Sequence, residues 1–155
     1  MNILLVDDEA TFLEQSSIFL SRGEVFAEAI LDSEESLNTV TANSVEEALD
    51  KLDSEEDYEV IISDFKMPDK NGIEFLRIVR EERDSEIPFI LFTGKGNEDI
   101  ALEALEKGAN MYLEKSGDPD SQYRSLLQAS VQEALHKREI DDLKTQLEEC
   151  RSKNK

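Results

Sequence analysis

The segment VIISD, residues 60–64, decides the fold of this chain. It is a short apolar run that stops at an aspartate, and such a run has the length of a buried strand rather than of a helix. Three similar runs lie at Ile3–Val6, Phe89–Phe92 and Met111–Glu114, and a fifth run, Leu37–Ala42, alternates polar and apolar residues. We therefore predict five strands, of which Leu37–Ala42 has one solvated face.

Segments with helical periodicity separate the predicted strands. Their apolar residues recur at steps of three or four, and Ser44 with Glu47 three positions later forms a capping box. Gly108 is a predicted helix end, and Asp118 followed by a proline is a predicted helix start. The five predicted helices span about residues 10–31, 44–52, 71–80, 97–108 and 118 onward.

Strict alternation of strands and helices predicts an α/β fold, in which helices cover both faces of a parallel sheet. The 155 residues are sufficient for one domain with a hydrophobic core. The composition changes after about His136, and we predict a domain over residues 1–135 and a helical extension over residues 136–155.

The extension carries four apolar residues among charges, at steps of three and four: Ile140, Leu143, Leu147 and Cys150. This spacing is that of a thin coiled-coil seam. Two interpretations stay open, a frayed helical tail and a helix that continues outward to another chain or to an output domain.

The net charge of −20, from 37 acidic and 17 basic residues, excludes several classes of partner. A nucleic-acid-binding module needs a basic face, so we expect no nucleic-acid partner. The same charge argues against docking on an anionic membrane leaflet, and no apolar run is long enough to span a membrane. The N-terminus has no basic leader, and Cys150 is the only cysteine, so we expect a cytoplasmic protein without an internal disulfide.

The residues that follow the buried strands carry the candidate chemistry. Asp7 and Asp8 follow the first apolar run, Asp64 the second, Thr93 the third and Lys115 the fourth. Because the carboxyl ends of parallel strands lie at one edge of a sheet, three carboxylates, a hydroxyl and an ammonium are expected at one rim.

Such a rim favours a magnesium ion and a phosphoryl group. Three neighbouring aspartates repel one another, and a hard divalent cation with oxygen ligands removes that penalty. A carboxylate beside the ion, such as Asp64, can act as a nucleophile toward phosphorus. Phosphoryl transfer needs positioning and charge stabilisation, which Lys115 and the Thr93 hydroxyl would supply around the phosphoryl oxygens.

The ordered motifs closely resemble the response-regulator receiver family of two-component signalling. They are Asp7-Asp8-Glu9, residues 61–72 around Asp64, Phe92-Thr93-Gly94 and Tyr112-Leu113-Glu114-Lys115. The resemblance covers about residues 1–135. It implies a flavodoxin-like, doubly wound five-stranded sheet of order 2-1-3-4-5, with the first and third strands side by side at the switch point.

The resemblance also implies the residues of a magnesium site. Asp64 resembles the phosphoacceptor, Asp8 a direct magnesium ligand, and Asp7 a ligand that acts largely through water. The main-chain carbonyl of Lys66 resembles the third protein ligand of the family.

A second set of roles concerns the phosphoryl group and the switch. Lys115 resembles the lysine that pairs with the phosphoryl group, Thr93 the hydroxyl residue that moves toward it, and Tyr112 the aromatic residue whose rotamer follows. The implied donor is a phosphohistidine of a sensor histidine kinase or phosphotransfer protein. Small acyl phosphates are expected substitutes.

Two features depart from the family pattern. Ser116 stands where the family usually has a proline after the lysine, which favours a trans peptide bond and a differently shaped loop. The link at Val25–Ser36 is long, and we predict an extended first helix there, with a surface loop as the alternative. The segment after Lys115 is similar to receivers common in archaea, where sensory or kinase domains often follow.

Two other functions compete with the phospho-switch. A phosphohydrolase with an aspartyl nucleophile usually has a second acid two positions later, where this chain has Lys66, so we expect no enzyme beyond self-phosphorylation and self-dephosphorylation. A receiver-like interaction module without phosphorylation is the other alternative. A homodimer and a downstream sensory or kinase domain are both open as partners.

Overall fold

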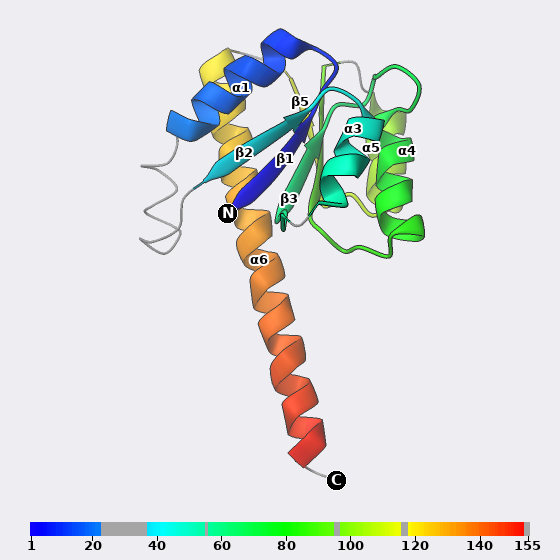
Figure 1. Ribbon diagram of the computed structural model, residues 1–155, viewed down its shortest axis with the longest axis vertical. Helices are drawn as coiled ribbons and strands as arrows, with labels where there is room; N and C mark the ends of the chain where they lie inside the picture. The colour runs from blue at the N-terminus through cyan, green and yellow to red at the C-terminus, as the bar shows by residue number, and fades with distance from the viewer. Residues whose placement is uncertain (23–36, 55, 95–96, 116–117, 154–155) are drawn as a thin grey trace.

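The computed structural model describes residues 1–22, 37–54, 56–94, 97–115 and 118–153 (Figure 1). Five parallel strands form one sheet of order β2-β1-β3-β4-β5. They are β1 (Asn2–Val6), β2 (Asn38–Ala42), β3 (Val60–Ser63), β4 (Phe89–Thr93) and β5 (Met111–Glu114). This confirms the flavodoxin-like fold, and every strand lies within one residue of its predicted range.

Helices cover both faces of the sheet, as the alternating sequence predicts. They are α1 (Ala10–Arg22), α3 (Val45–Leu52), α4 (Gly72–Arg77), α5 (Glu98–Glu106) and α6 (Pro119–Lys153), and a π-helical turn, η1 (Ile78–Glu82), extends α4. The part of the predicted first helix beyond Arg22 and the link at Val25–Ser36 lie outside the described residues.

Two apolar clusters, one on each side of the sheet, form the core. Successive side chains of a strand point to opposite faces, so Ile3 and Leu5 pack with α1 and α6 while Leu4 and Val6 pack with α3, α4 and α5. Since the central strands are buried on both faces, the sheet holds the ends of β1, β3 and β4 in fixed positions.

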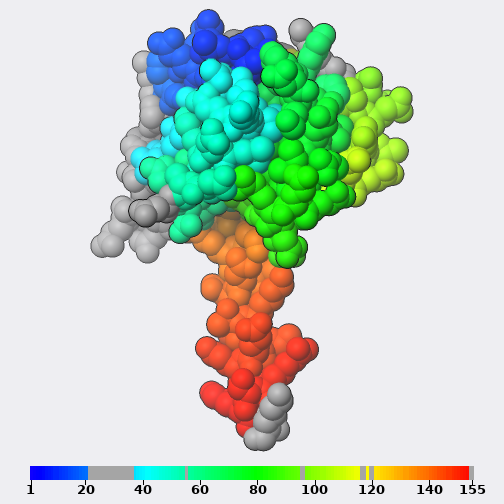
Figure 2. Space-filling model, turned by 45° about the vertical axis from the view of Figure 1, so that its right-hand side comes forward, coloured from blue at the N-terminus to red at the C-terminus, as the bar shows by residue number. Residues whose placement is uncertain are grey.

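Helix α6 continues as one helix of 35 residues across the predicted boundary at 135/136. Its first half packs against the sheet, and its second half projects from the globular body (Figures 1 and 2). The C-terminal extension is therefore helical through Lys153. Within the described ranges, no helix combines the length and the apolar character that crossing a bilayer requires.

Candidate functional site

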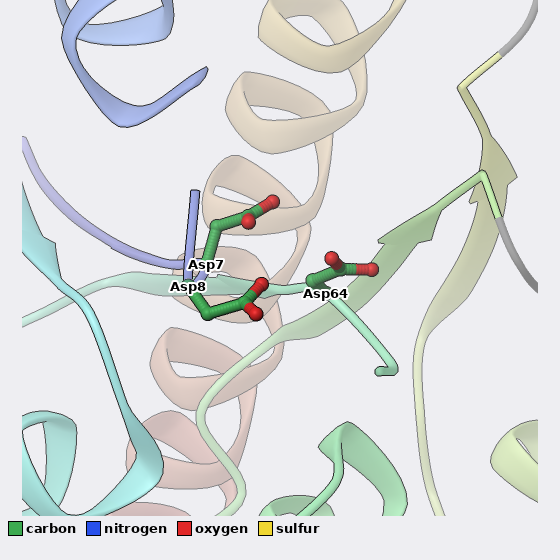
Figure 3. A group of neighbouring side chains, drawn as sticks. All are labelled: Asp7, Asp8 and Asp64. Carbon is green, nitrogen blue, oxygen red and sulfur yellow. The ribbon is translucent and has the colours of Figure 1, made fainter. Parts of the chain in front are cut away.

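The ends of β1 and β3 lie side by side and bring three aspartates together. The Asp64 N–H donates a hydrogen bond to the Val6 carbonyl (2.9 Å), so the residue after β3 is tied to the end of β1. Asp7, Asp8 and Asp64 each offer a carboxylate oxygen, and these oxygens lie within 4.8 Å of one another (Figure 3). The strand order thus assembles the predicted carboxylate cluster.

Asp7 is the buried member of the cluster, with 1% of its surface exposed. One oxygen accepts the Glu9 N–H (2.9 Å), and the other lies 2.6 Å from the Lys115 ammonium. Burial raises the pKa of Asp7 to about 6, the Asp64 charge adds to this, and the bonds from Lys115 and Glu9 oppose it. A cation beside Asp7 would remove the desolvation penalty.

Asp64 stands at the edge of the same cluster and is partly buried. Its Oδ1 accepts the Phe65 N–H (2.7 Å), whereas its Oδ2 faces the Lys115 ammonium at 3.6 Å. The turn that follows is held close to the strand, because Gly72 donates its N–H to the Phe65 carbonyl (2.8 Å). A Cβ at Gly72 would lie 2.3 Å from the Asp64 carbonyl oxygen, so only glycine permits this approach.

Lys115 reaches the cluster from the end of β5. Its N–H donates to the Thr93 carbonyl (3.1 Å), which fixes its backbone beside the end of β4. Its ammonium lies 3.8 Å from the centre of the Phe12 ring, where the negative face of an aromatic ring attracts a cation. The side chain is 17% exposed and is held between an aromatic ring and two carboxylates.

A cavity of about 260 Å³ opens over these groups. Its lining residues are Asp8, Glu9, Phe12, Asp64, Lys66, Gly94 and Lys115. The two predicted ligand carboxylates Asp8 and Asp64, the predicted carbonyl donor Lys66 and the predicted phosphoryl partner Lys115 thus share one concave site.

Thr93 and Tyr112 do not line this cavity. Thr93 is buried at the end of β4 and is not among the residues that line the cavity. Tyr112 is paired with Leu91 in the β4–β5 register and packs against the cluster on the α5 side of the sheet. Its hydroxyl is buried without a hydrogen-bond partner within the described part of the chain, and burial together with the Glu114 charge raises its pKa.

The donor set fits a magnesium ion. Mg²⁺ prefers oxygen ligands and commonly combines one or two carboxylates with water and phosphate oxygens. Two of the three carboxylates line an open cavity, and the third, Asp7, is buried with its pKa already raised by the lack of solvent. Asp7, Asp8, Asp64 and the Lys66 carbonyl are the groups that would hold the ion.

Phe12 is a site residue that the sequence reasoning did not single out. It lies in the first turn of α1, and its ring contacts the Lys115 ammonium. No local pattern marked it, because the contact joins Phe12 in α1 to Lys115 at the end of β5, and it depends on how α1 packs. The peptide bond after Lys115 involves Ser116, which lies outside the described residues.

The fold is a doubly wound parallel sheet, and it gathers three aspartates and a lysine at the ends of β1, β3 and β5. The family model described as the response regulator receiver domain matches residues 3–126. The chain is 34% identical over 120 residues to the chemotaxis protein CheY1 of Helicobacter pylori, covering 77% of this chain and 88% of that one.

Solved structures agree with this assignment. A response regulator receiver domain protein from Clostridium thermocellum superposes with a TM-score of 0.70 at 26% identity, covering 90% of this chain and 97% of the other. The chemotaxis response regulator CheY4 of Vibrio cholerae gives 0.66 at 26% identity, covering 83% and 97%. This chain belongs to the response regulator receiver domain family.

Proposed function

We propose that this chain is the phospho-accepting receiver of a cytoplasmic two-component phosphorelay. Asp64 takes a phosphoryl group from the phosphohistidine of a sensor histidine kinase or phosphotransfer protein. The observation that carries the proposal is that Asp64 Oδ2 lies 3.6 Å from the Lys115 ammonium in the lining of one cavity, beside two further aspartates.

The contacts of the two Asp64 oxygens favour Oδ2 as the attacking atom. Asp64 Oδ1 is engaged by the Phe65 N–H, whereas Oδ2 faces the cavity side on which Lys115 lies. Oδ2 forms the new bond to phosphorus while the bond from phosphorus to the donor imidazole nitrogen breaks, and the imidazole leaves with that electron pair. The product is an acyl phosphate on Asp64.

Lys115 changes its partner during this step. In the unphosphorylated chain its ammonium is 2.6 Å from Asp7. A Mg²⁺ ion held by Asp7, Asp8, Asp64 and the Lys66 carbonyl would supply positive charge beside the phosphoryl oxygens. Lys115 exchanges Asp7 for the phosphoryl group on Asp64, because its ammonium is only 3.6 Å from Asp64 Oδ2.

The output depends on Thr93 and Tyr112. We propose that the Thr93 hydroxyl turns toward the phosphoryl group and that Tyr112 moves into the space this creates. The supporting observation is that the buried Tyr112 hydroxyl has no hydrogen-bond partner among the described residues. An unsatisfied buried hydroxyl costs about 1–3 kcal/mol, so a movement that gives it a partner is favourable. The change alters the surface of α5 and β5, where Leu102 and Leu105 are exposed.

Intact mass after incubation with acetyl phosphate and Mg²⁺ tests the proposal. Wild type should gain the mass of one phosphoryl group, and Asp64→Asn should gain none. Lys115→Ala should fold but gain much less, because its ammonium no longer stabilises the transferring group. Glu9→Gln is the matched control: it changes a cavity carboxylate without a proposed role and should phosphorylate nearly as wild type. An equal mass gain in Asp64→Asn would refute the assignment.

A further inference from the structure

The half of α6 that projects from the globular body, here called the free half, covers about residues 140–153. It carries an apolar stripe among charged residues. Residues 141–153 are all exposed, and the side chains of Leu143 and Leu147 are 57% and 53% exposed. Together with Ile140 and Cys150 they follow a spacing of three, four and three residues. Two leucines left in water at this spacing indicate a surface that another helix covers.

The stripe faces away from the globular body. Nine residues of a helix make two and a half turns, so residues nine apart lie on opposite sides. Leu143 is nine residues after Ala134, which is buried against the sheet. Leu147 is nine residues after Arg138, whose guanidinium binds Glu59, the residue before β3.

The same relation holds at the end of the stripe, where Cys150 lies nine residues after Asp141. Asp141 lines a second cavity between α6 and the body. A partner helix can therefore lie along the stripe without displacing α6 from its own domain.

The stripe begins where the body ends. Continuing the heptad backward places the exposed His136 at the next inner position, so the apolar pattern starts with Ile140. Ile140 and Leu147 occupy the a positions, and Leu143 and Cys150 the d positions. The first heptad, with the β-branched Ile140 at a and Leu143 at d, has the pattern that favours a parallel two-stranded coiled coil.

The flanking charges specify a second copy of this chain. In this register Glu139 is at a g position and Lys144 at the following e position, the two positions that pair between parallel chains. The later g and e positions hold the neutral Gln146 and Arg151, so no like charges oppose each other there. The acidic residues lie instead at the outer b and c positions: Asp141, Asp142, Glu148 and Glu149.

We propose that the C-terminal half of α6 joins two copies of this chain as a parallel, in-register coiled coil over residues 140–153. Lys144 also lies 3.4 Å from Glu86 of its own chain, but these side chains are 59% and 71% exposed, so this pair is weak and Lys144 can turn to the partner. Two heptads are few, so the dimer forms reversibly with rising concentration. It is independent of the phosphoryl chemistry at Asp64.

Sedimentation equilibrium of the full chain over a hundredfold range of concentration tests the dimer. Wild type should move from monomer toward twice the monomer mass. The double variant Leu143→Glu/Leu147→Glu should raise the dimer dissociation constant more than tenfold. Leu102→Glu/Leu105→Glu is the matched control, because it removes two equally exposed leucines from α5 and should leave the constant unchanged. A wild type that stays monomeric, or a dimer that only the α5 pair disrupts, overturns the proposal.

Cysteine cross-linking tests the orientation. In the parallel register the two Cys150 thiols face each other, so oxidation with diamide should give a disulfide-linked dimer at high yield. Cys150→Ser/Thr145→Cys moves the thiol to an outer f position and should cross-link poorly. Equal yields from the two positions would exclude the in-register arrangement, and the unchanged helical circular dichroism of all variants is the check on folding.

Discussion

At the scale of single residues, the burial of the ionised Asp7 carboxylate lowers the free energy of unfolding. Its pKa is about 6 in the folded chain against an ordinary value of 3.8, and burial is the main cause. Between these two values the folded chain holds the proton more tightly than the unfolded chain. The free energy of unfolding therefore falls as pH rises from about 4 to 6, by about 3 kcal/mol in total.

The first prediction follows for Asp7→Asn in the absence of divalent metal. The amide keeps an acceptor for the Glu9 N–H and removes the buried charge. We expect a gain of about 1–3 kcal/mol in the free energy of unfolding near pH 7.5, and about half that gain near pH 5. Urea unfolding in EDTA measures both. Asp8→Asn, at the exposed carboxylate of the same cluster, is the control and should gain less. A destabilised Asp7→Asn at pH 7.5 would mean that the Lys115 bond outweighs the desolvation.

The second prediction concerns magnesium affinity. The ion needs the ionised form of Asp7, and a group with a pKa near 6 is mostly ionised at pH 7 and mostly protonated at pH 5. The affinity for Mg²⁺ should therefore fall about tenfold from pH 7 to pH 5. Titration calorimetry at the two pH values measures it. The Asp7→Asn variant should bind more weakly and lose most of the pH dependence, and an equal slope in that variant would assign the titration to another group.

Much of the site was predictable at this scale because topology fixes it. Asp7, Asp64 and Lys115 converge since parallel strands end at one edge, and that requires only the strand order. The unequal burial of Asp7 and Asp8 was not predictable, because it depends on which way the chain turns after β1. The ring of Phe12 beneath Lys115 depends in the same way on how α1 packs.

At the scale of elements, the turn between β3 and α4 depends on one glycine. A Cβ at Gly72 would lie 2.3 Å from the Asp64 carbonyl oxygen and 2.7 Å from Leu91 Cδ1. Both neighbours belong to the rigid sheet region, so neither can move freely. The sequence showed Gly72 only as part of a helix start, because a close approach between distant segments leaves no local pattern.

The third prediction is the effect of Gly72→Ala. Overpacking of this kind costs about 1–3 kcal/mol of stability, and it also displaces the carboxylate of Asp64, so phosphorylation by acetyl phosphate should slow. Thermal unfolding and the rate of mass gain measure the two effects. Gly94→Ala is the matched control in the same cavity, because a Cβ there meets Lys115 Cβ at 3.6 Å, an ordinary contact. Equal stability of the two variants would contradict the packing argument.

Local signals predicted the ends of several elements. The Ser44 hydroxyl accepts the Glu47 N–H (3.1 Å), and Gly108 has the left-handed φ of 106° that a helix end requires. The π-helical turn η1 was missed. Within it, Arg80 donates hydrogen bonds to the Gly108 carbonyl and to the Asn110 side chain, which are 28 and 30 residues away. Partners this distant in the sequence cannot be detected from the periodicity of apolar residues.

At the scale of the whole molecule, an ion pair links α6 to the segment just before β3. The Arg138 guanidinium makes two bonds of 2.7 Å to the two carboxylate oxygens of Glu59, and both side chains are about one-third exposed. Glu59 is itself held by its N–H bond to the Asn2 carbonyl (2.9 Å). The pair lies where α6 leaves the body, so it sets the direction in which the free half of the helix projects.

The fourth prediction is that Arg138→Ala lowers the free energy of unfolding by about 1 kcal/mol, since a paired, partly exposed fork of this kind is stronger than a simple surface pair. Hydrogen exchange should rise from about residue 135 onward while the sheet keeps its protection, because α6 loses its two-bond ion pair with Glu59 and keeps only the exposed pairs with Glu86 in this region. A double-mutant cycle with Glu59→Gln isolates the pair. The control is Glu86→Gln, whose partners Lys137 and Lys144 reach a side chain that is 71% exposed, and it should leave stability nearly unchanged. If the cycle gives no coupling between Arg138 and Glu59, the direction of α6 is set by the apolar contacts of Val131 and Ala134 alone.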